Sequence, residues 1–224
     1  MRNIKKVLIT GITGSGGSYL ADYISNNHKN VKIYGISRWH STTSEENINL
    51  SKKIIIHECD MNDFSSLYYV IKKVKPDCIF HLAAYANVKA SFHNPSTVLQ
   101  NNIISTTNLF EVLKILNLNP IFQLCSTSEV YGQVLKSEIP INENNPIRPS
   151  SPYAVSKVAQ DLLGYSYFKS YNFNIIRTRM FTYINPRRSD LFATSFARQI
   201  ARIEVGLQDK LYHGNLNSIR TLLD

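Results

Sequence analysis

Apolar runs of strand length alternate with segments of helical spacing along most of the 224-residue chain. The runs are rich in Val, Ile and Leu, which is typical of strands that a parallel sheet buries on both faces. We expect strands at 5–10, 31–36, 54–57, 78–84, 121–125 and 173–179. We expect helices at 15–27, 64–74, 96–116, 152–170 and 191–206, where apolar residues recur every three or four positions. This alternation predicts a doubly wound parallel α/β sheet.

Two stretches interrupt the alternation. The segment 39–50 is polar and rich in Ser, Thr and Asn, which predicts a long loop. The segment 134–151 is irregular and contains three prolines, Pro140, Pro146 and Pro149. Because ligands of doubly wound sheets bind at the carboxyl ends of the strands, the residues that follow each strand are the candidates for function.

Composition narrows the class of protein. Hydrophobic residues make up 43% of the chain and charged residues 18%, which is enough apolar material for a buried core. No apolar run reaches the roughly 18 residues of a membrane span, and the charged N-terminus is followed by a strand-length run and then by glycines. We therefore expect a cytoplasmic protein that binds no membrane.

The formal net charge is +9, but Lys and Arg are spread along the chain without a basic block. This distribution favours phosphorylated small molecules over nucleic acid. The three cysteines, Cys59, Cys78 and Cys125, lie in separate apolar runs without paired spacing. We expect buried free thiols, with no disulfide framework and no metal site. His81 ends an apolar run, so we expect it to be a packed core histidine.

A glycine-rich stretch directly after the first predicted strand is the first candidate site. Thr10–Gly17 reads T-G-I-T-G-S-G-G and precedes a predicted helix. Small residues allow close approach of the backbone to a pyrophosphate, and a helix start offers N–H groups and partial positive charge. This strand, turn and helix predict a Rossmann-type dinucleotide site. Its expected phosphate-binding residues are Gly11, Thr13, Gly14, Ser15, Gly16 and Gly17.

The residue after the second predicted strand indicates which dinucleotide binds. Sheets specific for NAD usually carry an acidic residue here, which binds the ribose hydroxyls. This chain has Ser37 and Arg38. A cation suits the 2′-phosphate of NADP, so we expect NADP, with NAD as the alternative.

A second candidate site combines a tyrosine and a lysine four residues apart. Tyr153 and Lys157 share one face of a predicted helix. An ammonium group beside a phenol favours the phenolate, so Tyr153 is a candidate base. Thr127 ends the fifth predicted strand, where its hydroxyl can polarise a substrate oxygen. These three residues form a set that can remove a proton from an alcohol while hydride leaves for a nicotinamide.

These stretches together resemble a known family. The motifs are Thr10–Gly17, His81-Leu82-Ala83-Ala84, the run S-T-S-E-V-Y-G at 126–132 and the run S-P-Y-A-V-S-K at 151–157. The chain resembles the extended short-chain dehydrogenase/reductase family over its whole length. Within that family it is similar to the GDP-mannose 4,6-dehydratase branch, which has comparable runs at 11–14, 17–20, 126–129 and 186–188.

The resemblance implies a reaction. Tyr153, assisted by Lys157 and Thr127, takes the 4-OH proton of a nucleotide-linked sugar, and hydride passes from C4 to NADP. Glu129 then removes the acidified C5 proton and assists loss of water from C6, where the hydride returns. The product is a 4-keto-6-deoxy sugar. The resemblance also places Asp60 and Met61 at the adenine, Leu82, Ala83 and Ala84 at the cofactor, and Ser128 at the substrate.

The stretch at 180–188 departs from the branch. Thr182 stands where the branch has Asn, and Tyr183-Ile184 stand where it has His-Glu. Arg187 and Arg188 remain, and an arginine fork suits a diphosphate. Arg220 lies in a segment that resembles the family's return to the sheet, and it would face the same diphosphate. The expected substrate is a GDP-hexose or a GDP-heptose. A C4 dehydrogenase, an epimerase or a reductase of the same family is the alternative, and a non-catalytic NADP-binding scaffold is a remote one.

The resemblance also implies a division of the chain. Residues 1–184 form an NADP-binding Rossmann domain, and residues 185–224 form part of a substrate-binding domain that family members continue further. We expect these 224 residues to bind NADP but to turn over poorly alone. Members of the family commonly form dimers or tetramers, so we expect a homo-oligomer.

Overall fold

The computed structural model describes residues 3–39, 54–219 and 221–223. The chain divides into two compact units, Met1–Met180 and Phe181–Asp224. The expected boundary at 184/185 therefore lies a few residues later than the one observed. The predicted loop at 39–50 lies, apart from Trp39, outside the described residues.

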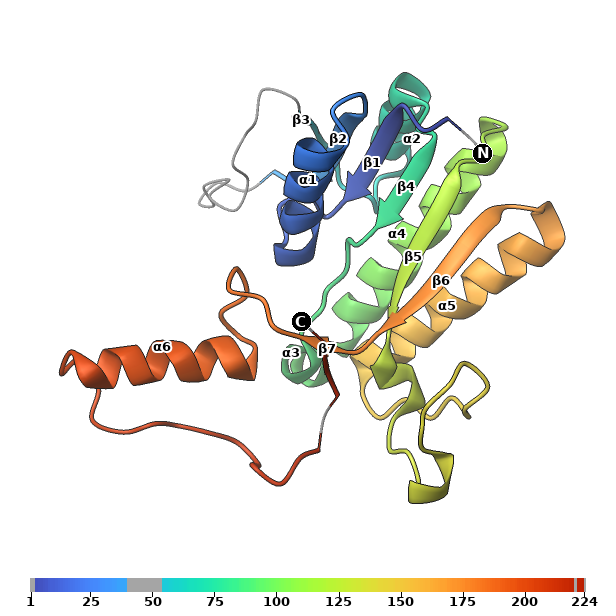
Figure 1. Ribbon diagram of the computed structural model, residues 1–224. Coiled ribbons are helices and arrows are strands. Elements are labelled where there is room, and N and C mark those ends of the chain that lie inside the picture. Colours follow the sequence, from blue (N-terminus) through green and yellow to red (C-terminus); the bar gives the residue numbers. More distant parts are fainter. Residues whose placement is uncertain (1–2, 40–53, 220, 224) are drawn as a thin grey trace. The chain divides into compact units, whose positions relative to one another are not determined.

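The first unit is built on a six-stranded parallel sheet with the order β3-β2-β1-β4-β5-β6 (Figure 1). This order confirms the doubly wound, Rossmann-type fold, because the chain runs outward from β1 to β3 and then returns to β4 on the other side of β1. The strands are β1 (Lys6–Thr10), β2 (Lys32–Ser37), β3 (Ile54–Glu58), β4 (Cys78–His81), β5 (Ile121–Thr127) and β6 (Asn174–Met180).

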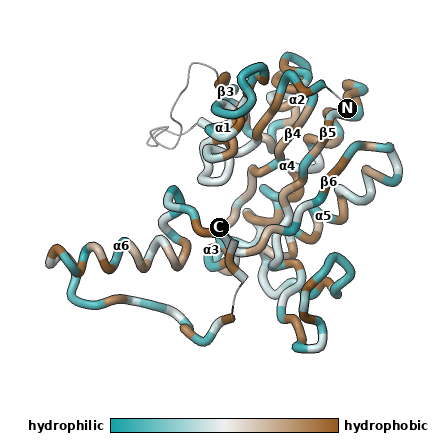
Figure 2. The backbone as a smooth tube through the Cα atoms, in the orientation of Figure 1, coloured by the Kyte–Doolittle hydropathy of each residue, from teal (hydrophilic) through white to brown (hydrophobic). Residues whose placement is uncertain are grey.

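Helices cover both faces of the sheet. They are α1 (Ser15–Asn27) on one face and α2 (Phe64–Val74), α4 (Pro95–Ile115) and α5 (Pro152–Tyr171) on the other, while the short α3 (Val88–His93) packs against α4 and α5. Alternate residues of β1 enter different cores: Val7 and Ile9 pack with α1, whereas Leu8 packs with α2, α4 and α5. Burial on both faces explains why β1 appears in the sequence as a continuous apolar run. Figure 2 shows hydrophobic stretches along the central strands.

Most predicted elements agree with the structure, and several short elements were not predicted, among them the strands β7 (Thr182–Tyr183) and β8 (Leu222–Leu223). The helix at 64–74 and its cap agree in full, because the Asp63 carboxylate accepts a hydrogen bond from the Ser66 amide. The short helix α3 was not predicted, since six residues are too few to reveal a period. Two 3₁₀ turns, η1 (Ser128–Tyr131) and η2 (Lys136–Glu138), were also not predicted. Cys59, Cys78 and Cys125 are free thiols, as expected, but only Cys59 and Cys78 are buried, whereas Cys125 is partly exposed.

The second unit contains a short parallel pair of strands and one helix. β7 (Thr182–Tyr183) pairs with β8 (Leu222–Leu223), and α6 spans Phe192–Glu204. The segment expected to return to the main sheet thus forms a separate two-stranded sheet. The tube of α6 alternates between hydrophobic and hydrophilic residues in Figure 2, and every residue of this fully described helix is partly or fully exposed. Across the described parts of both units, no helix combines the length and apolar character that a membrane crossing requires.

Candidate active site

The glycine turn after β1 is held against the end of β4. Gly11 has a φ of +68°, and a Cβ at this position would lie 2.9 Å from the backbone N and Cα of Ala83. The Gly14 amide donates to the Gly11 carbonyl at 3.0 Å, which closes the turn. Only a residue without a side chain satisfies both the backbone angle and the close approach at Gly11.

The same turn begins α1. Gly14 is the N-cap, and the first turn of the helix contains only Ser15, Gly16, Gly17 and Ser18. A Cβ on Gly17 would lie 2.3 Å from the Gly11 carbonyl oxygen, so the helix and the turn approach at the limit of backbone contact. The helix start therefore presents backbone N–H groups without a charged or bulky side chain in front of them, as a phosphate site requires.

A cavity opens beside this turn at the carboxyl ends of β1, β2, β3 and β4. The predicted cofactor residues that line it are Gly11, Thr13, Gly14, Arg38, Asp60, Met61, Leu82, Ala83 and Ala84. Lining residues that the sequence did not indicate are Ile36, Ser37, Cys59, Asn62, Asn101 and Ser105. The sequence contains a hint for two of them, because Ser37 adjoins the predicted Arg38 and Asn62 adjoins the predicted Met61. Residues from four strand ends thus surround one cavity, at the edge of the sheet where doubly wound folds bind their ligands.

Two polar residues mark the far end of this cavity. Arg38 is exposed, which leaves its guanidinium group in solvent at the cavity wall. The Asp60 carboxylate accepts hydrogen bonds from the Asn62 amide at 2.9 Å and from its side chain at 3.2 Å. The Met61 carbonyl accepts from Asn108 of α4, which fixes this loop to the helix.

A buried polar chain connects the glycine turn to the helices behind it. The Ala83 amide donates to Thr10 Oγ1, which lies 2.9 Å from His81 Nδ1. Because Thr106 donates its own proton to the Asn102 carbonyl, His81 Nε2 donates to Thr106 Oγ1 at 2.8 Å. Burial keeps the imidazole neutral, so its Nδ1 accepts the proton of the Thr10 hydroxyl.

His81 is therefore a core histidine, as predicted. Its side chain is buried, and burial together with the charge of Lys157 lowers the pKa of His81 to about 3. The residue fixes the exit of β4 without touching the cavity, because both ring nitrogens are occupied within the core.

Asn102 joins the loop after β4 to α5. Its side-chain oxygen accepts from the Tyr85 amide at 2.7 Å, and its side-chain nitrogen donates to Ser156 Oγ at 2.9 Å. Ser156 donates in turn to the Tyr153 carbonyl at 2.6 Å. This fully buried asparagine therefore fixes the first turn of the helix that carries Tyr153.

The predicted Tyr153 and Lys157 lie in the first two turns of α5. Ser151 caps the helix by accepting from the Ala154 amide at 3.0 Å, and Pro152 follows at the first helical position. Tyr153 is 9% exposed and Lys157 is 4% exposed. The Lys157 ammonium donates to the Cys125 carbonyl at 2.7 Å, and burial lowers its pKa. The lysine thus ties α5 to the end of β5.

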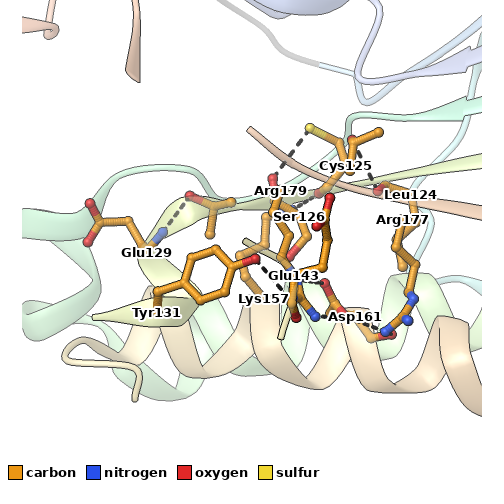
Figure 3. Close-up of polar contacts among 12 residues, drawn as sticks. Leu124, Cys125, Ser126, Glu129, Tyr131, Glu143, Lys157, Asp161, Arg177 and Arg179 are labelled. Carbon is orange, nitrogen blue, oxygen red and sulfur yellow. Dashed lines mark hydrogen bonds and ion pairs between the residues drawn. The ribbon is translucent and has the colours of Figure 1, made fainter. Parts of the chain in front are cut away.

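Thr127 ends β5 and begins the 3₁₀ turn η1, which contains Ser128 and Glu129. Thr127 Oγ1 accepts a hydrogen bond from the Glu129 amide at 3.3 Å. Thr127 lies two residues after Cys125, the carbonyl partner of Lys157 (Figure 3). The structure therefore gathers the threonine, the lysine and the glutamate at one strand end.

A charged cluster that was not predicted from the sequence lies next to this strand end. Asp161 is fully buried in α5, and its carboxylate pairs with Arg177 Nη1 at 2.6 Å and with Arg179 Nε at 2.9 Å. Burial alone would raise the pKa of Asp161, but the hydrogen bonds and charges of the two arginines outweigh it and lower the pKa. One signal existed in the sequence, because Asp161 follows Lys157 by four residues on the same helix face.

The remaining predicted substrate residues belong to the second unit. Thr182 pairs with Leu222 between β7 and β8. The Arg187 amide donates to the side chain of Asn185. The Arg188 guanidinium donates two hydrogen bonds to the Asp190 carboxylate, at 2.8 and 3.2 Å. That pairing raises the pKa of Arg188. Arg220 lies outside the described residues, and its role stays a prediction.

Comparison with known proteins gives one family. The family profile described as GDP-mannose 4,6 dehydratase matches residues 8–223. The GDP-mannose 4,6-dehydratase of Yersinia enterocolitica serotype O:8 is 36% identical over 228 residues, which cover 97% of this chain and 60% of that protein. The chain thus spans about 60% of the length of this curated relative.

Solved structures give the same fold. RMD from Pseudomonas aeruginosa, complexed with NADPH, superposes with a TM-score of 0.81 at 29% identity, over 98% of this chain and 69% of that one. A Thermus thermophilus UDP-glucose 4-epimerase, complexed with NAD, superposes with a TM-score of 0.78 at 26% identity, over 90% of this chain and 63% of that one.

Proposed function

Because the chain belongs to the GDP-mannose 4,6-dehydratase family, we propose that the protein converts a GDP-hexose or GDP-heptose to its 4-keto-6-deoxy product. One observation carries this proposal. Thr127 and Glu129 share a turn at the end of β5, and Lys157 of the Tyr153 helix is bonded to the same strand end. Oxidation at C4 needs Tyr153, Lys157 and Thr127, and elimination across C5 and C6 needs Glu129. The two steps act on neighbouring carbons, so these groups must lie side by side.

The first unit is proposed to bind NADP. The support is the close approach at Gly11 and Gly17, which leaves backbone N–H groups open at the start of α1, and the cavity beside them. When bound, NADP supplies the hydride acceptor that makes oxidation of the alcohol reversible. Arg38 at the cavity wall is suited to the 2′-phosphate, and an NAD-dependent enzyme is the alternative.

Tyr153 is the proposed base toward the sugar 4-OH. Lys157 follows Tyr153 by one helical turn, and a carbonyl partner fixes its ammonium group, whose charge is proposed to favour the phenolate of Tyr153. Burial of Lys157 strengthens this effect, since a charge in a low-dielectric environment acts more strongly on its neighbours. Thr127 offers a hydroxyl to the same sugar oxygen.

Glu129 is the proposed base toward the C5 proton. A 4-keto group acidifies this proton, and a positioned carboxylate can then remove it. The C6 hydroxyl leaves as water once it receives a proton, and Glu129 is the proposed donor of that proton. An alcohol dehydrogenase or an epimerase of the same fold needs no such elimination base.

The second unit is proposed to contribute to substrate binding through Thr182, Arg187 and Arg188. A guanidinium fork matches a diphosphate, and Arg188 already holds a carboxylate in bidentate geometry. A diphosphate that binds through Nε and Nη2 of Arg188 would therefore displace Asp190. A homodimer or homotetramer is proposed from the resemblance alone.

Product mass tests the proposed function. The full-length protein is incubated with NADP and either GDP-mannose or a GDP-heptose, without added reductant. Loss of one water without net oxidation supports the dehydratase. Loss of two hydrogens, with stoichiometric reduced cofactor, would make the protein a C4 dehydrogenase. If neither GDP-sugar changes in mass, the non-catalytic scaffold is favoured.

A further inference from the structure

Arg179 of β6 lies at the centre of a cluster of polar side chains from α5, β6 and η1. Its Nε and Nη2 donate to the two carboxylate oxygens of Asp161 at 2.9 and 3.2 Å. Its Nη1 donates to the Tyr131 hydroxyl at 2.9 Å and to the Glu143 carbonyl at 3.1 Å (Figure 3). The guanidinium carbon also lies 5.2 Å from the centre of the Tyr131 ring. One side chain thus connects α5, β6 and the turn η1.

Tyr131 is the last residue of that turn and is 3% exposed. The turn has only four residues, so the position of its end determines the position of Glu129. Two further bonds complete its support: the Gly132 amide donates to the Glu129 carbonyl at 3.2 Å, and the Arg148 amide donates to the Val130 carbonyl at 2.9 Å. Tyr131 is the residue of this turn that contacts the side-chain cluster, because its hydroxyl accepts a hydrogen bond from Arg179.

On the other side, Asp161 follows Lys157 by four residues in α5. The helix that carries Tyr153 and Lys157 is therefore joined, through Asp161 and Arg179, to the turn that carries Glu129. Arg177 provides a useful contrast. It pairs with the same carboxylate at 2.6 Å, but its ring contact is with Tyr165 of α5 and not with η1.

We propose that Tyr131 and Arg179 are positioning residues that hold Glu129 for the elimination step. This inference rests on the proposed dehydratase function. It assigns Arg177, by contrast, a role in stability alone. Hydride transfer depends on Tyr153 and Lys157, which are fixed by Ser151, Ser156 and Cys125 independently of Tyr131. Loss of the Tyr131 hydroxyl is therefore expected to separate the two chemical steps.

The first test needs no substrate. Amide hydrogen exchange is measured at Glu129–Gly132 in Tyr131→Phe and in the matched control Arg177→Gln. The phenylalanine keeps the ring and removes only the bond to Arg179. We expect exchange of the Gly132 amide to accelerate about tenfold in Tyr131→Phe and to stay within about twofold in Arg177→Gln. Equal exchange at this amide in both variants would overturn the inference.

The second test separates the chemical steps in the full-length protein with GDP-mannose. We expect the rate of water loss to fall about tenfold in Tyr131→Phe, while the initial oxidation at C4 stays within about twofold. Reduced nicotinamide then accumulates ahead of the dehydrated product. In Arg177→Gln both rates stay close to those of the unmodified protein. Equal slowing of both steps in Tyr131→Phe would overturn the proposal, because the cluster would then only support the fold.

The two proposals fail in different ways. If the unmodified full-length protein releases no water from GDP-mannose or from a GDP-heptose, the dehydratase function is wrong, whatever the variants do. If the unmodified protein releases water but Tyr131→Phe retains its ratio of water loss to C4 oxidation, the function stands and the positioning role is wrong.

Discussion

In the first unit, the two halves of the carboxyl edge of the sheet differ in the chemical groups that they offer to a ligand. At the ends of β1 to β4, the candidate cofactor site is made of backbone: glycines, amides and short side chains around a cavity. At the ends of β5 and β6, the candidate catalytic site is made of side chains, among them the buried charges of Lys157 and Asp161 and the partly buried charge of Arg179. The first offers a ligand mainly shape and backbone N–H groups, whereas the second offers charged side chains.

This difference has an energetic consequence. A backbone cradle requires no desolvation of charged groups, so its cost is conformational and falls on the glycines. A buried Lys157 and a buried Asp161 each require partners that compensate for lost hydration. A change in the cradle is therefore expected to alter cofactor affinity and stability together, whereas a change at the charged end can alter chemistry with little effect on binding.

Glu129→Gln tests the charged end and is expected to have the largest effect. Glutamine keeps the shape and the backbone bond to Thr127 but cannot accept the C5 proton. We expect the rate of water loss to fall by about 10² to 10⁴, the range for loss of a positioned general base. Product mass measures this rate in the full-length protein, and calorimetric titration of NADP serves as the control. Turnover equal to that of the unmodified protein would remove Glu129 from the mechanism.

Gly17→Ala tests the backbone end. In an ordinary helix this change stabilises by about 0.5–1 kcal/mol, because alanine has the better helix propensity. Here the added Cβ would lie 2.3 Å from the Gly11 carbonyl oxygen. We expect a net destabilisation of about 2 kcal/mol, typical of overpacking, and weaker binding of NADP. Urea unfolding and cofactor titration measure both quantities.

Gly214→Ala is the matched control for this substitution. A Cβ at Gly214 meets no heavy atom of the described residues within 4 Å. We expect its effect on the free energy of unfolding to stay within about 0.5 kcal/mol. A stabilised Gly17→Ala with unchanged NADP affinity would show that the close approach of α1 to the turn does not constrain the site.

The buried chain through His81 connects the two ends and predicts a pH dependence. The unfolded histidine takes up a proton near pH 6.5, whereas the folded one does so only near its pKa of about 3. Between these values the unfolded state binds more protons, so stability falls as the pH falls. Across the 1.5 pH units from 6.5 to 5, this amounts to about 2 kcal/mol. Urea unfolding at pH 7 and pH 5 measures the loss, and His81→Gln is expected to lack most of it. Equal losses in both proteins would mean that His81 is not held neutral.

The sequence predicted the backbone end better than the charged end, and the reason is physical. A glycine turn, its strand and its helix are local, so Gly11–Gly17 appears as one continuous motif. The cluster around Asp161 joins residues 131, 143, 161, 177 and 179, which only the folded chain brings together. Sequence spacing indicated Tyr153 and Lys157 because they share one helix face. It did not reveal that Lys157 would be bonded to the Cys125 carbonyl across the sheet.

The smallest expected effect concerns the choice of cofactor at the backbone end, where Arg38 is the one cation among the described residues that line the cavity. Arg38→Gln keeps the length of the side chain and removes its charge. Because Arg38 is exposed, water and salt weaken its attraction for a phosphate, and we expect the Kd for NADP to rise about tenfold. The Kd for NAD stays within about twofold, since NAD lacks the 2′-phosphate. Lys32→Gln removes an exposed cation from the opposite end of β2 and is expected to change neither constant. Calorimetric titration at two salt concentrations separates these cases, because the salt dependence of NADP binding weakens in Arg38→Gln alone. An unmodified protein that binds NAD as tightly as NADP would overturn the preference itself and leave Arg38 a solvated residue at the rim of the cavity.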